Sequence, residues 1–474
     1  MKTINEKKKT INTATAIEAM NAGSKDRLVK RAYGGPGCGK TTYVLDQLNR
    51  LLGKVPPKDI AFVSFTNKGV NEGVERAYLR YNNVSKEDTP YWGTLHSICN
   101  KIACNNKGKI ITSRDYKEFS RALGMRFVGY FTEDLKHEDD HYLFMNNLER
   151  TNTDKAEKVY DGIVDRMKFL WVKENYNKFK DIYKLYDFTD MLEIYLEEGE
   201  PLPVKYMIVD EAQDLSPLQW QVVGLMSRNC DEVIVAGDDD QAIYGWCGGD
   251  ADVFNGIDSG KDIVLEDSYR LKENIIKVSE NIIQPIFNRR HKRIRPVPNT
   301  NSVVNNGNVL MYSNLNDVVL KNDRSYYILS RNRCYLKEIK NWLMIVGVPF
   351  KYCGVQYPRN IEGRNKIKFN GLEHNYCNRM KDKSYARGDN DGRITVDTIH
   401  RVKGGEADEV VLLLDVTPAV NENLLHNRDE ELRTLYVAVT RARMALHVVY
   451  STQRLSYDAI VSASLRMSTK ELVL

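Results

Sequence analysis

Short apolar runs alternate along the chain with longer stretches that have the spacing of amphipathic helices. A short apolar run that ends in polar or small residues is typical of a strand buried on both faces of a parallel sheet. Seven segments fit this description: 28–33, 61–64, 206–210, 233–237, 326–330, 394–398 and 410–415. Helical patterns such as residues 42–52 separate them. The alternation predicts an α/β protein with doubly wound parallel sheets.

Two stretches interrupt this alternation. Residues 105–171 are rich in charged residues, Asn and aromatics at helical spacing, which predicts a helical insertion. Residues 353–390 hold eight Lys and Arg among Asn and Gly, which predicts a short, basic, loop-rich insertion. A solvated surface and a nucleic-acid contact explain that charge equally well. The predicted lobes are then 1–104 with 172–258, and 259–352 with 391–474.

Composition adds bounds on size and location. The chain has 474 residues, 42% hydrophobic and 28% charged, as in ordinary globular proteins with several domains. It has no apolar run of signal-peptide or membrane-span length, so we expect a cytoplasmic protein, in a bacterium or a virus-infected host cell, with no membrane partner. The eight cysteines are scattered and are expected to be reduced thiols. A net charge of +5 is too small to identify a polyanionic partner.

A phosphate-binding loop is predicted at residues 34–41, which match G-x-x-x-x-G-K-[ST] between a predicted strand and a predicted helix. Glycines let backbone N–H groups surround phosphate oxygens at a helix N-terminus. Lysine offsets phosphate charge, and the hydroxyl of the following residue can bind Mg²⁺. The expected ligands are Gly35, Gly37, Gly39, Lys40, Thr41 and Thr42, with Thr41 on the metal. A glycine-rich turn without a ligand is the alternative, and the strand-loop-helix context disfavours it.

Two successive carboxylates, Asp210 and Glu211, stand at the end of the predicted strand 206–210. Asp210 is expected to hold hydrated Mg²⁺, and Glu211 is expected to accept a proton from the water that attacks ATP. The alternative is an acidic helix cap, because Asp and Glu are favoured at helix starts. A phosphate loop in the same chain favours the catalytic interpretation.

The string Asp210-Glu211-Ala212-Gln213-Asp214, after a phosphate loop, resembles superfamily 1 helicases of the UvrD, Rep and PcrA group. Further segments resemble the motifs of that family in the family's order. They are 64–68 (motif Ia), 94–97 (Ib), 237–246 (III), 268–270 (IV), 398–406 (V) and 435–443 (VI).

The resemblance implies two RecA-like lobes with ATP in the cleft between them. Arg270 and Arg441 would then act as arginine fingers on the γ-phosphate. Gln241 would sense that phosphate and, with Lys40, would belong to the catalytic group. Tyr269 would stack on adenine, and Glu406 would bond the ribose.

The family also implies a track for nucleic acid. Aromatic faces can stack on bases without reading their identity. The expected contacts are Phe65, Asn67, Thr94, His96, Tyr244, Trp246 and His400, with Phe65 and Trp246 as stacking platforms. Outside such motifs, core packing would be the more common role of an aromatic residue.

The resemblance implies an ATP- and Mg²⁺-dependent DNA helicase that moves 3′ to 5′ on single-stranded and forked DNA, with replication or repair proteins as further partners. A translocase that strips proteins without productive unwinding and a phosphate-loop ATPase with another client are the alternatives, and RNA stays open as the track. Three departures are visible. Motif V has Gly405 where relatives usually carry a bulky apolar residue, and motif III has Gly245 and Gly248 around Trp246. We find no Leu-Asn-x-x-Gln adenine segment upstream of the loop, and the second-lobe insertion is reduced, as fits a compact or phage-encoded form.

Overall fold

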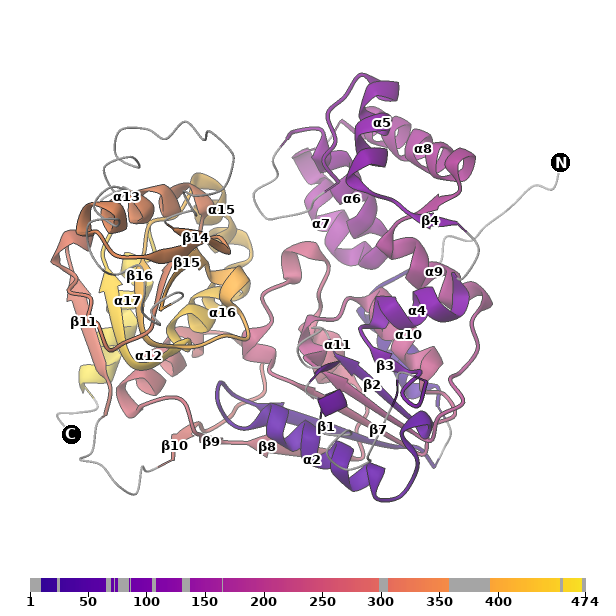
Figure 1. Cartoon of the computed structure of the whole chain (residues 1–474), viewed down its shortest axis with the longest axis horizontal. Helices are drawn as coiled ribbons and strands as arrows, with labels where there is room; N and C mark the ends of the chain where they lie inside the picture. Colours follow the sequence, from indigo (N-terminus) through magenta and orange to yellow (C-terminus); the bar gives the residue numbers. More distant parts are fainter. Residues whose placement is uncertain are drawn as a thin grey trace. The chain divides into compact units, whose positions relative to one another are not determined.

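The computed structural model describes residues 10–23, 26–64, 70–71, 73–75, 85, 87–104, 108–129, 137–163, 165–297, 306–357, 393–451 and 455–470. The chain divides into two compact units (Figure 1). The first unit comprises residues 1–35, 39–265 and 288–292, and the second comprises 36–38, 266–287 and 293–474.

The first unit is built on a six-stranded sheet with the strand order β3-β2-β6-β7-β1-β8. Every pairing in it is parallel. The strands are β1 (Leu28–Gly34), β2 (Ile60–Ser64), β3 (Trp92–Gly93), β6 (Tyr206–Asp210), β7 (Glu232–Gly237) and β8 (Lys261–Leu265). The predicted strands at 28–33, 61–64, 206–210 and 233–237 are therefore confirmed.

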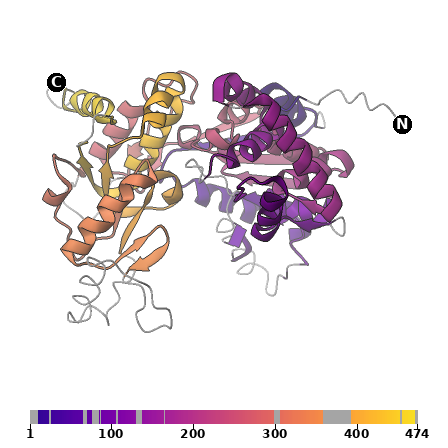
Figure 2. The same ribbon diagram turned by 90° about the horizontal axis from the view of Figure 1, so that it is seen from above.

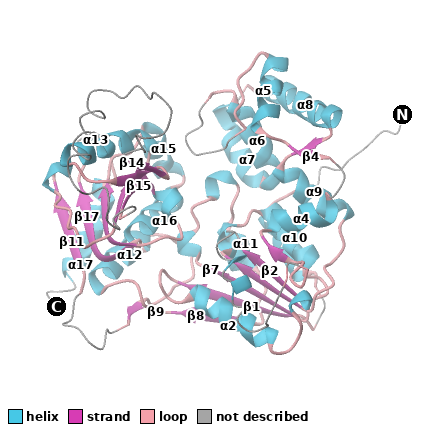
Figure 3. Cartoon of the chain, in the orientation of Figure 1, coloured by secondary structure: helices cyan, strands magenta, loops and turns pink. Residues whose placement is uncertain are grey.

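Helices cover both faces of this sheet, because successive strand residues point to opposite sides. Met207 and Val209 of β6 share one core with the helices on one face, whereas Ile208 shares another with α2 (Lys40–Leu52). The helices of the first core are α1 (Thr13–Asn21), α4 (Leu95–Ala103), α9 (Phe188–Glu198), α10 (Pro217–Met226) and α11 (Ala251–Gly256). Figure 3 shows these layers of helix and strand, which confirm the doubly wound fold.

A helical subdomain is inserted into the first unit. It contains α5 (Ser113–Leu123), α6 (Asp140–Thr151), α7 (Thr153–Ile163) and α8 (Arg166–Tyr183), framed by β4 (Lys109–Ile110) and β5 (Leu185–Tyr186). These helices gather beyond α4 and α9 in Figure 1. These helices lie where the insertion was predicted, but the predicted end at residue 171 falls inside α8. Val172, Tyr176 and Phe179 continue the buried face of α8, so the helix runs past that boundary.

The second unit has a seven-stranded sheet with the order β11-β17-β16-β12-β15-β13-β14. All pairings are parallel except the hairpin of β13 and β14. The strands are β11 (Asn308–Tyr312), β12 (Tyr326–Ser330), β13 (Phe350–Tyr352), β14 (Val355–Tyr357), β15 (Ile394–Thr398), β16 (Ala407–Leu413) and β17 (Ala442–Val449). The predicted strands 326–330, 394–398 and 410–415 correspond to β12, β15 and β16.

The helices of the second unit also lie on both faces of its sheet. Val411 and Leu413 of β16 share a core with α13 (Leu336–Val346), whereas α12 (Glu273–Ile283) packs on two other helices (Figure 2). Those two are α16 (Arg428–Val439) and α17 (Asp458–Lys470), and α15 (Pro418–His426) precedes α16. A small two-stranded sheet joins β9 (Asp267–Ser268) to β10 (Arg295–Pro296).

Two predicted boundaries in the second half need comment. The predicted lobe boundary after residue 258 is wrong, because β8 pairs with β1 and the first unit extends to Leu265. Most of the predicted basic insertion, 353–390, lies outside the described residues, which stop at 357 and resume at 393.

The seven cysteines among the described residues are free thiols, as expected. Among the described helices, none combines the length and apolar character needed to cross a lipid bilayer.

Candidate nucleotide and nucleic-acid sites

The predicted phosphate loop joins the end of β1 to the start of α2. Gly37 and Gly39 have φ angles of +70° and +74°, which glycine adopts far more easily than other residues. The first N–H groups of a helix have no partner within it, and its N-terminus attracts anions. Gly35 is buried, and Thr41 and Thr42 are exposed in the first turn of α2. The loop therefore fits a phosphate group.

Lys40 lies against the carboxylates at the ends of neighbouring strands. Its side chain is 10% exposed, and Nζ is 3.4 Å from Glu211 Oε2. Burial alone would lower the pKa of Lys40, but the carboxylates of Glu211, Asp238 and Asp210 raise it above the ordinary value. The ammonium group stays charged, and the surrounding acids provide oxygen ligands of the kind Mg²⁺ prefers. The residues present fit a magnesium-nucleotide complex.

The sheet order explains how these residues meet. β7 lies between β6 and β1, and all three strands are parallel, so their carboxyl ends share one edge. Asp210 ends β6, and Asp238 follows β7 directly. Asp210 is buried, and its Oδ1 accepts a hydrogen bond from the Glu211 N–H at 2.9 Å.

Buried hydrogen bonds connect the predicted base to the predicted phosphate sensor. Gln213 Nε2 donates to Glu211 Oε2 at 2.7 Å, and Gln213 Oε1 accepts from the Asp238 N–H at 2.9 Å. Asp238 Oδ2 accepts from Gln241 Nε2. Sequence reasoning treated Gln213 only as part of a motif string. A lone Gln between acidic residues gave no signal of the partners that the fold supplies.

The second unit gathers the other predicted nucleotide residues. Arg270 Nε is 2.5 Å from Glu406 Oε2, so the carboxylate expected to bond ribose is here paired with a predicted arginine finger. Arg441 is 1% exposed and donates to the carbonyls of Val437 and Gly405, each at 3.0 Å. Tyr269, in contrast, is 77% exposed.

Trp246 and His96, two of the predicted nucleic-acid residues, pack against aromatic rings. Trp246 stacks on Phe144 of α6, with ring centroids 6.2 Å apart and planes at 18°. His96 meets Phe188 edge-on at 5.7 Å, and burial lowers the pKa of His96 to about 4. The histidine is therefore neutral at physiological pH.

The predicted nucleic-acid contacts are spread over both units. His96 and Tyr244 line one cavity of about 420 Å³ where the helical subdomain meets the sheet domain. Thr94 caps α4 by accepting from the Ser97 N–H. His400 is buried in the second unit. Phe65 and Asn67 lie outside the described residues.

The start of α1 contains a partial match to the adenine segment that we did not find in the sequence. Ile11-Asn12-Thr13-Ala14-Thr15 shares only its Asn with Leu-Asn-x-x-Gln, since Ile11 stands in place of Leu and Thr15 in place of Gln. Asn12 caps α1 by accepting from the Thr15 N–H, and Thr15 Oγ1 accepts from Gln221 Nε2 at 2.8 Å. The Thr at this position explains why the pattern was missed.

Comparison with known proteins gives two family matches. Residues 14–261 match the UvrD/REP helicase N-terminal domain, and residues 364–453 match the UvrD-like helicase C-terminal domain. Together they enclose the phosphate loop, the carboxylate strand and the C-terminal motifs.

Several curated relatives are helicases. A probable DNA helicase II homolog of Mycoplasma capricolum is 30% identical over 56% of this chain and 40% of its own length. A probable DNA helicase of Mycoplasma pneumoniae is 23% identical over 90% of this chain and 81% of its own. The ATP-dependent DNA helicase PcrA of Bacillus subtilis is 26% identical over 55% and 38%. The chain thus spans about two fifths of the length of two of these relatives.

Proposed function

The chain belongs to the UvrD/Rep helicase family, and we propose that it is an ATP-driven motor that moves 3′ to 5′ on single-stranded DNA and separates duplex DNA. The observation that carries this proposal is the hydrogen-bonded group at the ends of β1, β6 and β7. It joins Lys40 to Glu211, and Glu211 through Gln213 and Asp238 to Gln241. Phosphoryl transfer to water needs a positive charge beside the phosphates, a proton acceptor and a group that contacts the γ-phosphate. Lys40, Glu211 and Gln241 would supply them in that order.

The loop between β1 and α2, together with the strand ends of the first unit, would bind and hydrolyse the nucleotide. The N–H groups of the loop at Gly35, Gly37 and Gly39 would bind phosphate with Lys40, and Thr41 and Asp210 would hold Mg²⁺. Glu211 would accept a proton as water attacks the γ-phosphorus and the bond to the β-phosphate oxygen breaks. ADP and inorganic phosphate are then the products.

The second unit would stabilise the charge that develops on the transferring group. Arg270 and Arg441 supply guanidinium groups suited to phosphate oxygens. Tyr269, which is largely exposed, offers a ring for adenine, and Glu406 offers a carboxylate for the ribose. In the proposed cycle Glu406 exchanges its ion pair with Arg270 for the sugar hydroxyls.

Single-stranded DNA would contact residues of motifs Ia, Ib, III and V. Trp246 and Phe65 are the proposed stacking platforms, because base stacking on aromatic rings tolerates any sequence. Asn67, Thr94, His96, Tyr244 and His400 are the proposed contacts to sugar, phosphate or base edges. Replication or repair proteins are the proposed protein partners.

ATP hydrolysis measured with and without single-stranded DNA tests the proposal, with Glu211→Gln as the variant that keeps side-chain size but cannot accept the proton. We expect DNA to stimulate hydrolysis and the variant to lose both the basal and the stimulated rate. Hydrolysis indifferent to DNA would instead identify an ATPase with another client.

Unwinding requires a separate measurement. Full hydrolysis and translocation without separation of a forked duplex would favour a protein-stripping translocase, the alternative suggested by the short insertion after β14. A single-stranded RNA of the same sequence, tested in parallel, distinguishes the two tracks.

A further inference from the structure

A buried lysine in the first unit forms ion pairs with three consecutive aspartates. The side chain of Lys292 is 0% exposed. Its Nζ is 2.9 Å from Asp238 Oδ1 and 2.8 Å from Asp240 Oδ2, and it also pairs with Asp239 Oδ1. Arg289 adds two bonds to Asp240, of 2.6 and 2.7 Å. Buried charges are tolerated when they are paired and hydrogen-bonded in this way.

The three carboxylates are close enough to suit a metal ion, since one oxygen from each lies within 4.8 Å of the others. The ammonium of Lys292 already fills the space among them. Burial would lower the pKa of Lys292, but Asp238, Asp240 and Asp239 raise it far above the ordinary value. Lys292 is therefore a permanent internal cation at this point of the fold.

Lys292 acts on the proposed nucleotide site through one carboxylate. Asp238 Oδ1 binds Lys292, and Asp238 Oδ2 accepts from Gln241 Nε2. The main-chain N–H of Asp238 is bonded to Gln213, which in turn donates to Glu211. Asp238 Oδ1 also accepts from the Asp240 N–H at 3.3 Å, so the lysine and this turn both contact the carboxylate that holds the amide of Gln241.

The position of Lys292 in the chain is unusual. Residues 288–292 belong to the first unit, although α12 before them and β10 after them belong to the second. β10 pairs with β9. The short segment from Lys292 to β10 thus connects the lysine that pairs with Asp238 to the two-stranded sheet of β9 and β10. β9 leads directly into Tyr269 and Arg270, a proposed arginine finger.

We propose that Lys292 is a positioning residue, which holds Asp238 and through it Gln241 in the orientation needed to contact the γ-phosphate. The inference rests on the proposed ATPase function. It predicts that loss of Lys292 impairs turnover through Gln241, beyond any loss of stability.

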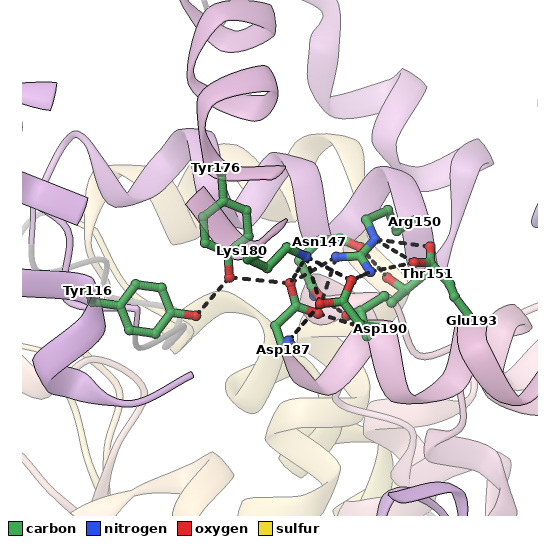
Figure 4. Close-up of polar contacts among 10 residues, drawn as sticks. Tyr116, Asn147, Arg150, Thr151, Tyr176, Lys180, Asp187, Asp190 and Glu193 are labelled. Atoms are coloured by element: carbon green, nitrogen blue, oxygen red, sulfur yellow. Dashed lines mark hydrogen bonds and ion pairs between the residues drawn. The ribbon is translucent and has the colours of Figure 1, made fainter. Parts of the chain in front are cut away.

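Lys180 provides a matched control for the stability effect. It is a buried lysine of the same unit, 7% exposed, 2.9 Å from Asp187 Oδ2 and 2.7 Å from Asp190 Oδ2 (Figure 4). Its partner Asp187 is the N-cap of α9, and its partner Asp190 lies in the first turn of α9. Neither belongs to the strand ends that carry Glu211 and Asp238. Lys180→Met therefore removes one of the two cations that pair with these half-buried carboxylates, since Arg150 still pairs with both, and it does not disturb Gln241.

The experiment is a double-mutant cycle on ATP hydrolysis with Lys292→Met, Gln241→Ala and the combined variant, with Lys180→Met measured beside them. We expect Lys292→Met to lower kcat on the order of 10²-fold, the effect of a misplaced catalytic contact. The KM for ATP should stay within about threefold, because the lost contact acts after binding. The combined variant should be no slower than Gln241→Ala, since both changes remove one contact.

Three results would overturn the proposal: wild-type kcat in Lys292→Met, an equal loss in Lys180→Met, or a combined variant whose loss is the product of the two single losses. Thermal unfolding checks that each variant is folded. If Lys292→Met does not fold, Lys292→Arg takes its place in the cycle, since it keeps the charge but not the single ammonium among three carboxylates. A wild-type chain without ATPase activity would refute both the proposed function and the role of Lys292. An active wild-type chain whose single losses multiply in the combined variant would refute only the role of Lys292.

Discussion

Glu211 adopts a left-handed backbone conformation, with φ of +53°. This conformation costs a residue with a Cβ atom roughly 1–2 kcal/mol. Strain of this kind persists where the surrounding structure determines it, often at sites of chemistry. At this position it directs the carboxylate to Lys40 Nζ at 3.4 Å and to Gln213 Nε2 at 2.7 Å.

Glu211→Gly and Glu211→Ala separate the strain from the chemistry. Both variants lack the carboxylate and should be inactive, but glycine accepts the left-handed conformation without penalty. We expect the free energy of unfolding of the glycine variant to be about 1 kcal/mol higher than that of the alanine variant. Urea denaturation of the two proteins measures the difference. Equal stability would show that the backbone relaxes once the side chain is removed.

The half-buried His96 should make stability depend on pH. Its pKa of about 4 in the folded protein lies below the ordinary value of about 6.5, so the unfolded chain binds a proton that the folded chain excludes. Stability should therefore fall as the pH drops from about 6.5 toward about 4. The urea midpoint should decline more steeply over that range in the wild type than in His96→Gln. Parallel declines in the two proteins would contradict the burial of a neutral imidazole.

At the scale of elements, the sequence predicted what depends on local pattern. The seven strands follow from apolar runs, and the structure has them. The helix predicted at 42–52 corresponds to α2, which begins two residues earlier, at Lys40. The order of the strands was not predicted. That order places Asp238 between Asp210 and the loop, because β7 lies between β6 and β1.

Other features depend on partners far apart in the chain, which a single sequence does not reveal. Lys292 meets Asp238 across more than fifty positions, and nothing near either residue indicates the pairing. The boundary at residue 258 failed because β8 joins the first sheet only by pairing with β1. The boundary at residue 171 failed for a local reason, since charged residues on α8 hid its continuous buried face.

The stack of Phe144 on Trp246 joins α6 of the helical subdomain to motif III. Aromatic pairs contribute about 0.5–1.5 kcal/mol beyond burial, so Phe144→Ala should weaken single-stranded DNA binding by about two- to tenfold if Trp246 is a stacking platform. Fluorescence anisotropy of labelled DNA at one salt concentration measures the change. Phe127→Ala is the control, because Phe127 stacks on Phe119 within the same subdomain at 5.0 Å. Equal losses in both variants would indicate general destabilisation of the subdomain.

At the scale of the whole molecule, the groups proposed for ATP turnover are divided between the two units. Lys40, Glu211 and Gln241 belong to the first, and Arg270 and Arg441 to the second. A group that binds the nucleotide and a group that acts only on the transferring phosphoryl should affect different kinetic constants. Variants of the second unit can therefore reveal whether it takes part in hydrolysis.

Arg270→Ala and Arg443→Ala provide that comparison, since both arginines pair with Glu406, at 2.5 and 3.7 Å. Only Arg270 is proposed to reach phosphate, and Arg443 is 53% exposed. We expect Arg270→Ala to lower kcat on the order of 10³-fold while binding of a fluorescent ATP analogue persists, because an arginine finger stabilises charge mainly in the transition state. Arg443→Ala should keep the wild-type kcat. Wild-type turnover in Arg270→Ala would rule out Arg270 as an arginine finger and would leave Arg441 as the second unit's remaining candidate at the γ-phosphate.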